Sequence, residues 1–269
     1  MLAGGSGARI GAGRNKVYLP LGERTVLGWS LHAFAAHPEI GTVVLVTRPE
    51  DAEQAGREVA DLAPVEIVTG GATRQESEWC GLHLLADRIA AEAVDTVLIH
   101  DGARPLVSSA LISAVLAAAR ADGGAVPGLL RDDLAAATPD GSGLPWPPGA
   151  DALVAVQTPQ GFRARPLLAA YDRAREEGFV GTDTASCVQR FTDLPVRWVP
   201  ATSTTSRSLT RTTSRARNAL CPSSPDETIG ADGRPGTAQL PPALPVVVAR
   251  RTGRPRLRAR QPPTPPARR

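Results

Sequence analysis

Lysine is almost absent from this sequence of 269 residues: Lys16 is its one lysine, and the other 29 basic residues are arginines. In a sequence with so little lysine, the one lysine that is present suggests a position where arginine cannot replace it. Arginine is a planar fork, whereas lysine is a compact point charge on a flexible stem, and a site built around one phosphoryl group can require the second. The alternative is that Lys16 is a compositional accident on a solvated surface, where lone charges usually lie.

Cysteine and long apolar runs are scarce as well. Cys80, Cys187 and Cys221 have no paired spacing and no histidine cluster beside them, which excludes a disulfide framework and a Cys/His metal site. No Ser/His/Asp or Cys/His arrangement is visible, so a covalent nucleophile is not indicated. There is no signal peptide and no apolar run long enough to cross a membrane. We therefore expect a cytoplasmic protein with no membrane partner.

Acidic residues are rare at the C-terminal end of the chain. Residues 201–269 hold 13 Arg against 3 acidic residues, whereas the preceding part holds 17 basic and 24 acidic residues. A basic tail can indicate a nucleic-acid partner. This one has no aromatic residues interleaved with its charges, which makes it a weak signal. We expect no nucleic-acid partner and keep a nucleic-acid-binding tail as the rival interpretation.

Glycines crowd the start of the chain, in the run AGGSGARIGAGRNK from residue 3 to Lys16. Glycines let backbone amides approach an anion closely, and Arg9 and Lys16 add charge to the same place. The spacing does not fit a dinucleotide fingerprint, because the third glycine is not at the required position. It does not fit a Walker loop either, because no glycine stands immediately before Lys16 and Val17 stands where Ser or Thr is needed. The segment predicts a phosphate-binding loop of another kind.

Short β-branched runs alternate with helical patterns along the chain. Residues 41–47, 65–69 and 95–101 are typical of buried parallel strands. Apolar residues recur at helical spacing in the segments between and after them: 25–37, 48–62, 74–89, 108–123 and 165–179. Residues 153–158 and 196–200 supply further strands. The alternation predicts an α/β three-layer sandwich with a mostly parallel sheet and ligands at the carboxyl ends of its strands.

Four further segments identify a family. They are GGATRQES at 70–77, IHDGARPLV at 99–107, AVQTPQGF at 155–162 and GTDTAS at 181–186. With the glycine-rich run, and in this order, they resemble the 2-C-methyl-D-erythritol 4-phosphate cytidylyltransferases of the non-mevalonate isoprenoid pathway. The resemblance covers roughly residues 2 to 200. It implies a Rossmann-like nucleotidyltransferase sheet and transfer of a cytidylyl group from CTP to a polyol phosphate, with release of pyrophosphate.

The resemblance also implies roles for individual residues. Arg9 and Lys16 match the catalytic positions that stabilise charge on the triphosphate. The residues that match the nucleotide-binding positions are Ala3, Gly4, Gly5, Gly7, Gly71, Ala72, Ser77 and Gly102. An Asp often occupies the place of Ala72 in the family, so we expect the main chain to make that contact here. Small residues around the base favour CTP over a purine nucleotide.

The acceptor side is implied in the same way. Asp101, Thr158 and Thr182 match positions that contact the methylerythritol phosphate, and Thr184 replaces a common second acid. Asp101 ends a strand, where its carboxylate can hold Mg²⁺ or another divalent cation; the alternative is a turn or capping Asp. We expect Arg104 to pair with a nearby carboxylate and the neighbouring His100 to be a hydrogen-bonded core histidine.

Residues 129–152 interrupt the strand and helix alternation. In the family the corresponding segment is a protruding arm that embraces a second subunit, so the resemblance implies a homodimer; the alternative is a long surface loop. Family members place an Arg on this arm to steer the substrate phosphate, and here that position is Ala150. Losing that cation is expected to weaken substrate binding.

Both ends of the chain depart from the family. The family has a central strand before the glycine-rich loop, and here only Met1 and Leu2 precede Ala3. The codons after Val199 can be read in a shifted frame, in which each new codon takes the third base of one printed codon and the first two bases of the next. This shifted frame is compatible with the amino-acid sequence G-D-L-D-N-L-K-V-T-H-P-D-D-L-A-R-A-E. We therefore expect one nucleotidyltransferase domain over residues 1–200, and an out-of-frame, disordered tail over 201–269.

Two other functions stay open on the sequence. The first is a ribitol- or other sugar-phosphate cytidylyltransferase of the same fold. The second is a catalytically impaired, nucleotide-binding remnant, which the missing first strand, Ala150 and the aberrant tail would explain.

Overall fold

Helices and strands alternate through the part of the chain that the computed structural model describes, which is residues 1, 15–62, 65–131, 153–201 and 246–250. The helices are α1 (Val26–Ala35), α2 (Ala52–Val59), α3 (Arg74–Leu84), α4 (Ala86–Ala90), α5 (Ser109–Asp122), α6 (Ala164–Glu176) and α7 (Thr184–Phe191), with short 3-10 helices η1 (Lys16–Tyr18) and η2 (Pro49–Asp51). The strands are β1 (Pro20–Leu21), β2 (Arg24–Thr25), β3 (Ile40–Thr47), β4 (Val65–Thr69), β5 (Val94–Ile99), β6 (Gly124–Arg131), β7 (Leu153–Val156), β8 (Gln160–Arg163), β9 (Val196–Pro200) and β10 (Val246–Arg250).

One sheet dominates the fold. Its strands lie in the order β4-β3-β10-β5-β8-β6-β7, and β9 pairs with the other edge of β6. The pairings β3–β4 and β6–β9 are parallel, whereas β7, β8 and β10 pair antiparallel with their neighbours. It follows that β3, β4, β5, β6 and β9 run in one direction. The predicted parallel-dominated α/β sheet is confirmed.

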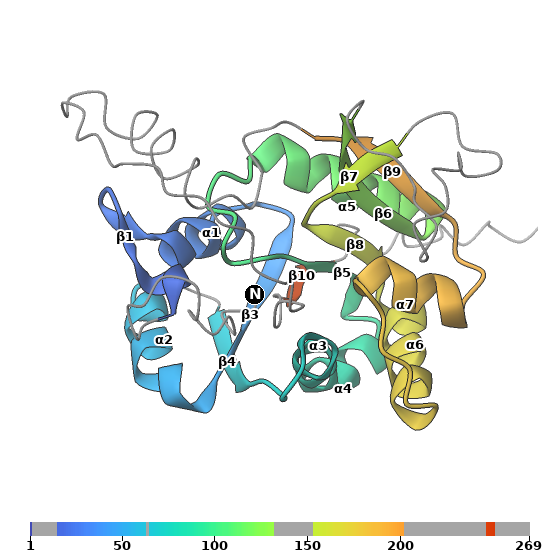
Figure 1. Cartoon of the computed structure of the whole chain (residues 1–269), viewed down its shortest axis with the longest axis horizontal. Coiled ribbons are helices and arrows are strands. Elements are labelled where there is room, and N and C mark those ends of the chain that lie inside the picture. The colour runs from blue at the N-terminus through green and yellow to red at the C-terminus, as the bar shows by residue number, and fades with distance from the viewer. Residues whose placement is uncertain (2–14, 63–64, 132–152, 202–245, 251–269) are drawn as a thin grey trace, which may run out of the picture.

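Two hydrophobic cores cover the two faces of this sheet. Alternation along β3 sends Val44 and Val46 into one core and Val43 and Leu45 into the other. The first core also contains residues of α3, α4, α6 and α7, and the second contains residues of α1, α2 and α5. Figure 1 shows the same division, with α1 and α5 on the opposite side of the sheet from α3 and α4. The three-layer arrangement follows from this period-two alternation in buried strands.

Capping residues set where the helices begin. Thr73 accepts a hydrogen bond from the backbone of Glu76, and Ser108 accepts one from Leu111 at 3.2 Å. These side chains satisfy amide groups that the first helical turn leaves without partners. Gly123 ends α5 with φ 117°, a left-handed conformation that favours glycine. The segment expected to form one helix over 74–89 is two, because the backbone turns at Leu85 between α3 and α4.

Strand β10 lies in the middle of the sheet, between β3 and β5 (Figure 1). It runs antiparallel to both, with Val247 opposite Val43 on one side and Leu98 on the other. The prediction of a disordered tail is therefore wrong for residues 246–250. The physical reason is that β3 and β5 each present an edge that needs a partner, and the run VVVA is rich in β-branched residues in an otherwise polar tail. The other residues from 202 onward lie outside the described part.

The base of the expected arm is an antiparallel ladder. Leu130 in β6 pairs with Val154 in β7, and Arg131 pairs with Leu153. Residues 132–152, including Ala150, lie outside the described part, so the arm itself stays a prediction. Among the described residues, no helix has the length and apolar character needed to span a membrane.

Candidate active site

The predicted site residues that the structure describes lie near the ends of β3, β4 and β5. Thr47 and Thr69 pair at the carboxyl ends of β3 and β4, and the amide of Gly70 donates to the carbonyl of Thr47 at 2.9 Å. Asp101 comes two residues after the end of β5, which runs in the same direction. Because parallel strands end at one edge of a sheet, the segments that follow them share that edge. The edge brings the GGATRQES and HDGARP segments to the same end of the molecule.

Ser77 closes the first of these segments against the start of α3. Its buried hydroxyl contacts the carbonyl oxygens of Gly71 at 3.3 Å and Thr73 at 2.9 Å. A Cβ at Gly70 would lie 2.6 Å from the Ser77 hydroxyl, and one at Gly71 would lie 2.4 Å from the Cβ of Glu76. Both glycines are therefore required by close packing of this loop on the helix. The result is a small-residue wall at the edge of the sheet.

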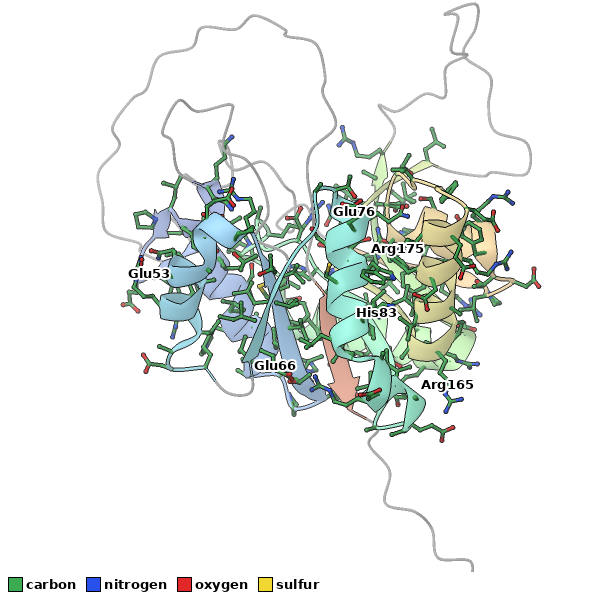
Figure 2. The ribbon with its side chains drawn as sticks, turned by 90° about the horizontal axis from the view of Figure 1, so that it is seen from below. Glu53, Glu66, Glu76, His83, Arg165 and Arg175 are labelled. Atoms are coloured by element: carbon green, nitrogen blue, oxygen red, sulfur yellow. The ribbon has the colours of Figure 1, made fainter. Side chains whose placement is uncertain are left out.

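The backbone amide of Ala72 has a partner within this loop. It donates to the Glu76 carboxylate at 2.8 Å, and the amide of Thr73 donates to the same carboxylate oxygen at 3.1 Å. Thr73 and Glu76 together form a capping box at the start of α3. In Figure 2, Glu76 lies at the upper end of α3, and Glu66, near the start of β4, lies lower in the same view. The Ala72 amide is thus engaged within the loop, and the main-chain contact to a nucleotide expected at this residue stays a prediction.

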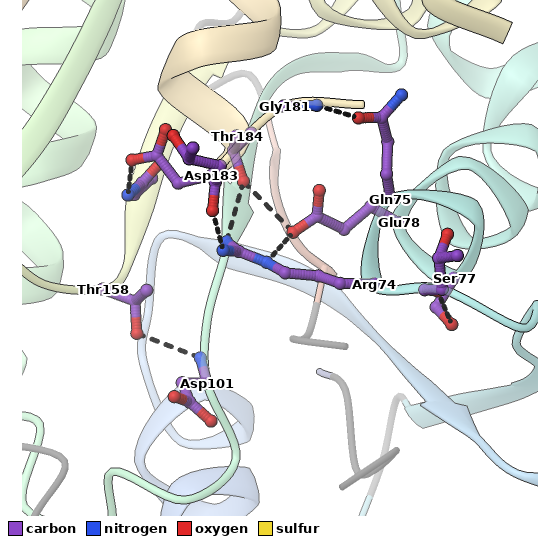
Figure 3. Close-up of polar contacts among 12 residues, drawn as sticks. Arg74, Gln75, Ser77, Glu78, Asp101, Thr158, Gly181, Asp183 and Thr184 are labelled. Carbon is purple, nitrogen blue, oxygen red and sulfur yellow. Dashed lines mark hydrogen bonds and ion pairs between the residues drawn. The ribbon is translucent and has the colours of Figure 1, made fainter. Parts of the chain in front are cut away.

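Asp101 and Thr158 are direct neighbours. The amide of Asp101 donates to the Thr158 hydroxyl at 3.0 Å (Figure 3). That hydroxyl lies 3.2 Å from Nδ1 of His100. All three residues are buried. Burial lowers the pKa of the His100 imidazole well below its ordinary value of 6.5, and the positive charge of Arg104 lowers it further. The expected hydrogen-bonded core histidine is confirmed, and it fixes the threonine beside Asp101.

The turn after β5 orients the Asp101 carboxylate. Its Oδ1 accepts from the amide of Ala103 at 3.2 Å, and its Oδ2 lies 3.7 Å from Nε of Arg104. Arg104 is buried, so the expected pairing with a nearby carboxylate is confirmed. Gly102 is held from the other side, because its carbonyl accepts from the Ser30 hydroxyl at 3.1 Å. The turn places Asp101 and Gly102 at the sheet edge with fixed backbone geometry.

Lys16 lies in η1, next to the end of β3. Asn15 caps η1 and donates to Asp51 at 3.0 Å, and the hydroxyl of Tyr18 lies 3.2 Å from that of Thr47. The Lys16 side chain is half-buried. The remaining predicted residues of the glycine-rich run, Ala3, Gly4, Gly5, Gly7 and Arg9, lie outside the described part. The structure thus places Lys16 near the end of β3, and the roles of all six residues stay predictions.

Contacts with α3 and the start of α7 hold the segment that contains Thr182. Nη1 of Arg74, in the first turn of α3, donates to the Thr182 carbonyl at 3.3 Å. Asp183 caps α7 and accepts from Nε2 of Gln160 at 3.0 Å, two residues along the chain from Thr158. The segment that carries Thr182 is therefore tied both to α3 and to the segment of Thr158.

Sequence reasoning missed four residues that build this site: Arg74, Glu76, Glu78 and Gln160. The capping box was visible as T-x-x-E at Thr73–Glu76. Arg74 and Glu78 are spaced four apart, which is the spacing of helical ion pairs, and their side chains lie 2.9 Å apart. Gln160 has no local signal, because its partners come from a distant segment.

Comparison with known proteins agrees with this geometry. The family described as "IspD: 2-C-methyl-D-erythritol 4-phosphate cytidylyltransferase" matches residues 1–215. The chain is 42% identical over 179 residues to a bifunctional IspD/IspF enzyme of Rhodopseudomonas palustris strain BisB18, which is 66% of this chain and 44% of that protein. The chain thus spans less than half the length of this bifunctional relative.

A single-function relative and a solved structure are covered more fully. The chain is 39% identical over 191 residues to the 2-C-methyl-D-erythritol 4-phosphate cytidylyltransferase of Syntrophotalea carbinolica, covering 70% of this chain and 80% of the relative. The crystal structure of a 4-diphosphocytidyl-2C-methyl-D-erythritol synthase from Anaerococcus prevotii shares the fold with a TM-score of 0.69 and 24% identity, over 81% of this chain and 93% of that one. With this sheet arrangement and this coverage, the chain belongs to the 2-C-methyl-D-erythritol 4-phosphate cytidylyltransferase family.

Proposed function

We propose that this chain transfers the cytidylyl group of CTP to 2-C-methyl-D-erythritol 4-phosphate and releases pyrophosphate, as a step of non-mevalonate isoprenoid biosynthesis. Membership of the family supports the reaction. The observation that carries it is the junction of three segments at one sheet edge: the loop closed by Ser77, the Asp101–Thr158 contact, and the Arg74–Thr182 contact. A nucleotide and a polyol phosphate bound on these segments would meet at that edge.

The reaction is attack by an acceptor phosphate oxygen on the α-phosphorus of CTP. Such transfers need in-line positioning and neutralisation of charge more than covalent help. Lys16 would hold charge on the triphosphate from the end of β3, together with Arg9. Gly71, Ala72, Ser77 and Gly102 would line the base and ribose, where the absence of large side chains suits a pyrimidine.

Asp101 would hold a divalent cation on the nucleotide phosphates. Mg²⁺ is commonly bound through one or two protein carboxylates plus substrate phosphates and water, and Asp101 offers one carboxylate at the carboxyl end of a strand. The chemistry of this donor fits the cation, and no group of three His, Cys, Asp or Glu residues occurs among the described residues. When bound, the cation would neutralise phosphate charge. The turn at Ala103 and Arg104 would hold the carboxylate toward it.

Thr158 and Thr182 would orient the acceptor. The Thr158 hydroxyl is fixed by His100 and by the amide of Asp101, so it can face a ligand in one orientation. Thr182 is exposed, and its backbone is tied to Arg74. Gln160 connects their segments, because its Nε2 donates to the carbonyl of Gln157 and to the carboxylate of Asp183. An acceptor between them would approach the nucleotide across Asp101.

A homodimer is part of the proposal. The ladder of β6 and β7 leads into residues 132–152, the expected arm, and exposed apolar side chains lie along these strands and β9: Leu130 is 56% exposed, Val156 43% and Trp198 42%. A contact with a second subunit would cover them. Sedimentation analysis tests this point, because a monomer at micromolar concentration would contradict it.

The function is tested by release of pyrophosphate from CTP with methylerythritol phosphate as acceptor. Parallel reactions replace the acceptor with ribitol phosphate or the nucleotide with ATP. We expect product with the first pair and at most a few per cent of that rate with either replacement. Preference for ribitol phosphate would identify a related cytidylyltransferase. Binding of CTP·Mg²⁺ without turnover would identify an impaired remnant and contradict the proposal.

A further inference from the structure

Glu78 is a buried carboxylate to which the proposed reaction gives no part. It lies in the second turn of α3 with 1% of its surface exposed. Its Oε1 accepts from Nε of Arg74 at 2.9 Å and from the Thr184 hydroxyl at 3.2 Å, and the Tyr171 hydroxyl donates to its Oε2. Residues of α6 and α7 thus meet a single carboxylate of α3. A buried acid with this many partners is held in one orientation.

Arg74 extends this contact to the substrate side of the site. Beyond Glu78, its Nη1 donates to the carbonyl of Thr182 and its Nη2 to the hydroxyl of Thr184 at 3.4 Å. Arg74 directly follows Thr73, which caps α3 at the end of the loop that contains Gly71. Figure 3 shows the guanidinium between the Glu78 carboxylate and the segment at Thr182–Thr184. The side chain therefore bridges two segments: residues 70–77, which we call the nucleotide segment, and residues 181–186, which we call the acceptor segment.

We propose that Glu78 is a positioning residue for the transfer: by holding Arg74, it fixes the backbone at Thr182 against the nucleotide segment. This inference rests on the proposed function for what the two segments bind. Glu78 itself touches neither substrate. Its effect passes through the guanidinium, which has a fixed planar arrangement of donors and can bond to a carboxylate, a carbonyl and a hydroxyl at once.

Neutral side chains hold the two flanks of the acceptor segment, and Arg74 holds its middle. Gln75 holds the flank of the segment, donating to the Phe179 carbonyl at 2.7 Å and accepting from the Gly181 amide at 2.8 Å. Gln160 holds the start of α7 through Asp183 and Ala185. These neutral amides frame the segment on both sides, and the bond at the Thr182 carbonyl between them comes from a cation. Removing the carboxylate that orients this cation should loosen the middle of the segment.

Burial makes the pair sensitive to substitution. Desolvation raises the pKa of the Glu78 carboxyl, while Arg74, Tyr171 and Thr184 act to lower it. Loss of one partner from a buried pair leaves the other charge without compensation. In Glu78→Gln the shape of the side chain is kept and the charge is lost. Arg74 should then turn toward solvent, and its bond to Thr182 should be lost.

The test compares three variants of the full chain. Glu78→Gln removes the charge. Tyr171→Phe is the matched control, because it removes a hydrogen bond to the same carboxylate without touching Arg74. The exchange variant Glu78→Thr with Thr184→Glu returns a carboxylate to Arg74 from α7, which the 3.2 Å contact between the two side chains allows. Two readouts are used: hydrogen exchange of the amides at 181–185, and KM for each substrate.

In Glu78→Gln we expect faster exchange at 181–185 and a KM for the polyol phosphate raised by about tenfold, the effect of one charge-assisted hydrogen bond. The KM for CTP should stay within about twofold, because the Ser77 closure of the loop is intact. Tyr171→Phe should leave both readouts unchanged, and the exchange variant should restore both in large part.

Equal effects of Glu78→Gln and Tyr171→Phe on the exchange of residues 181–185 would overturn the proposal and make Glu78 a packing residue. Failure of the folded exchange variant to restore slow exchange would overturn it as well. Absence of turnover in the unmodified chain would count against the proposed function instead. The exchange measurement would still decide the role of Glu78 in that case.

Discussion

Gly71 and Gly56 offer opposite outcomes for the same substitution. In Gly71→Ala the new Cβ would lie 2.4 Å from the Cβ of Glu76, whereas at Gly56, inside α2, it meets nothing within 4 Å. We predict that Gly71→Ala lowers the free energy of unfolding by about 1–3 kcal/mol and weakens CTP binding, because the loop must move off α3. Gly56→Ala should raise it by up to about 1 kcal/mol. Urea unfolding and calorimetric titration measure both; a neutral Gly71→Ala would contradict the packing argument.

The buried His100 side chain allows a prediction of how the free energy of unfolding depends on pH. Burial holds its pKa in the folded state well below 6.5. The unfolded state therefore binds a proton as the pH falls through 6.5 while the folded state does not, and stability is lost on the acid side. At pH 5.5 the loss from this group should approach about 1.4 kcal/mol relative to pH 7.5. Urea unfolding at the two pH values should show this loss, and His100→Gln should remove it. A pH dependence unchanged in the variant would show that other groups are responsible.

Substitution of Lys16 is expected to affect turnover far more than the binding of CTP. If its charge is needed most as pyrophosphate leaves, Lys16→Ala should lower kcat by about 100-fold or more and change the Kd for CTP much less. Lys16→Arg should recover little, because a planar guanidinium does not replace a compact ammonium at a half-buried position. Single-turnover kinetics measure the step directly. An unchanged kcat in Lys16→Ala would remove this residue from the reaction.

At the scale of elements, the strands and helices with strong periodicity could be predicted from the sequence. The continuous apolar runs of β3 and β4 and the capped helix α5 form within two residues of their predicted bounds. The strands β6 and β8 were missed, because Gly124 and Gly161 interrupt their patterns. Both glycines are there for packing: a Cβ at Gly124 would lie 2.8 Å from the ring of Phe162. Such constraints come from distant segments and leave no local pattern.

The same division holds within the site. Gly71, Asp101 and Thr158 could be named from their motifs, and the structure places all three at one sheet edge. The contacts that hold them could not, since His100 reaches Thr158 across 58 positions and Arg74 reaches Thr182 across 108. Only folding brings such partners together, so the sequence reveals the residues that face a ligand more readily than those that support them.

Strand β10 allows a prediction about one element. A proline in its middle removes a backbone donor where the strand has neighbours on both sides. Val247→Pro should therefore lower the free energy of unfolding by about 1–3 kcal/mol, the cost of leaving a buried partner unsatisfied. Thr252→Pro, two residues beyond the strand, is the control. Equal urea midpoints for both variants would mean that the pairing of β10 does not contribute to stability.

For the whole molecule, we predict that the reading frame after Val199 limits activity. Replacing residues 200–217 with the sequence G-D-L-D-N-L-K-V-T-H-P-D-D-L-A-R-A-E would supply a lysine beyond the last core strand and remove several arginines from the tail. A phosphate-steering cation should raise kcat/KM for methylerythritol phosphate by about tenfold or more. Pyrophosphate release by the two chains, assayed side by side, measures this. Equal activity would show that the tail is a tolerated variation.

The position of β10 also bears on the order in which the molecule is built. Its partners in β3 and β5 are complete once residue 99 has been synthesised, whereas β10 ends at residue 250 of 269. Until then the ribosome-bound chain carries these two strands without the strand that later lies between them. Contacts across so much sequence form slowly and leave sheet edges open to other chains in the meantime. The yield of folded protein should therefore depend on how fast the end of the chain is synthesised. It should also depend on chaperones that bind β3 and β5 until β10 pairs with them.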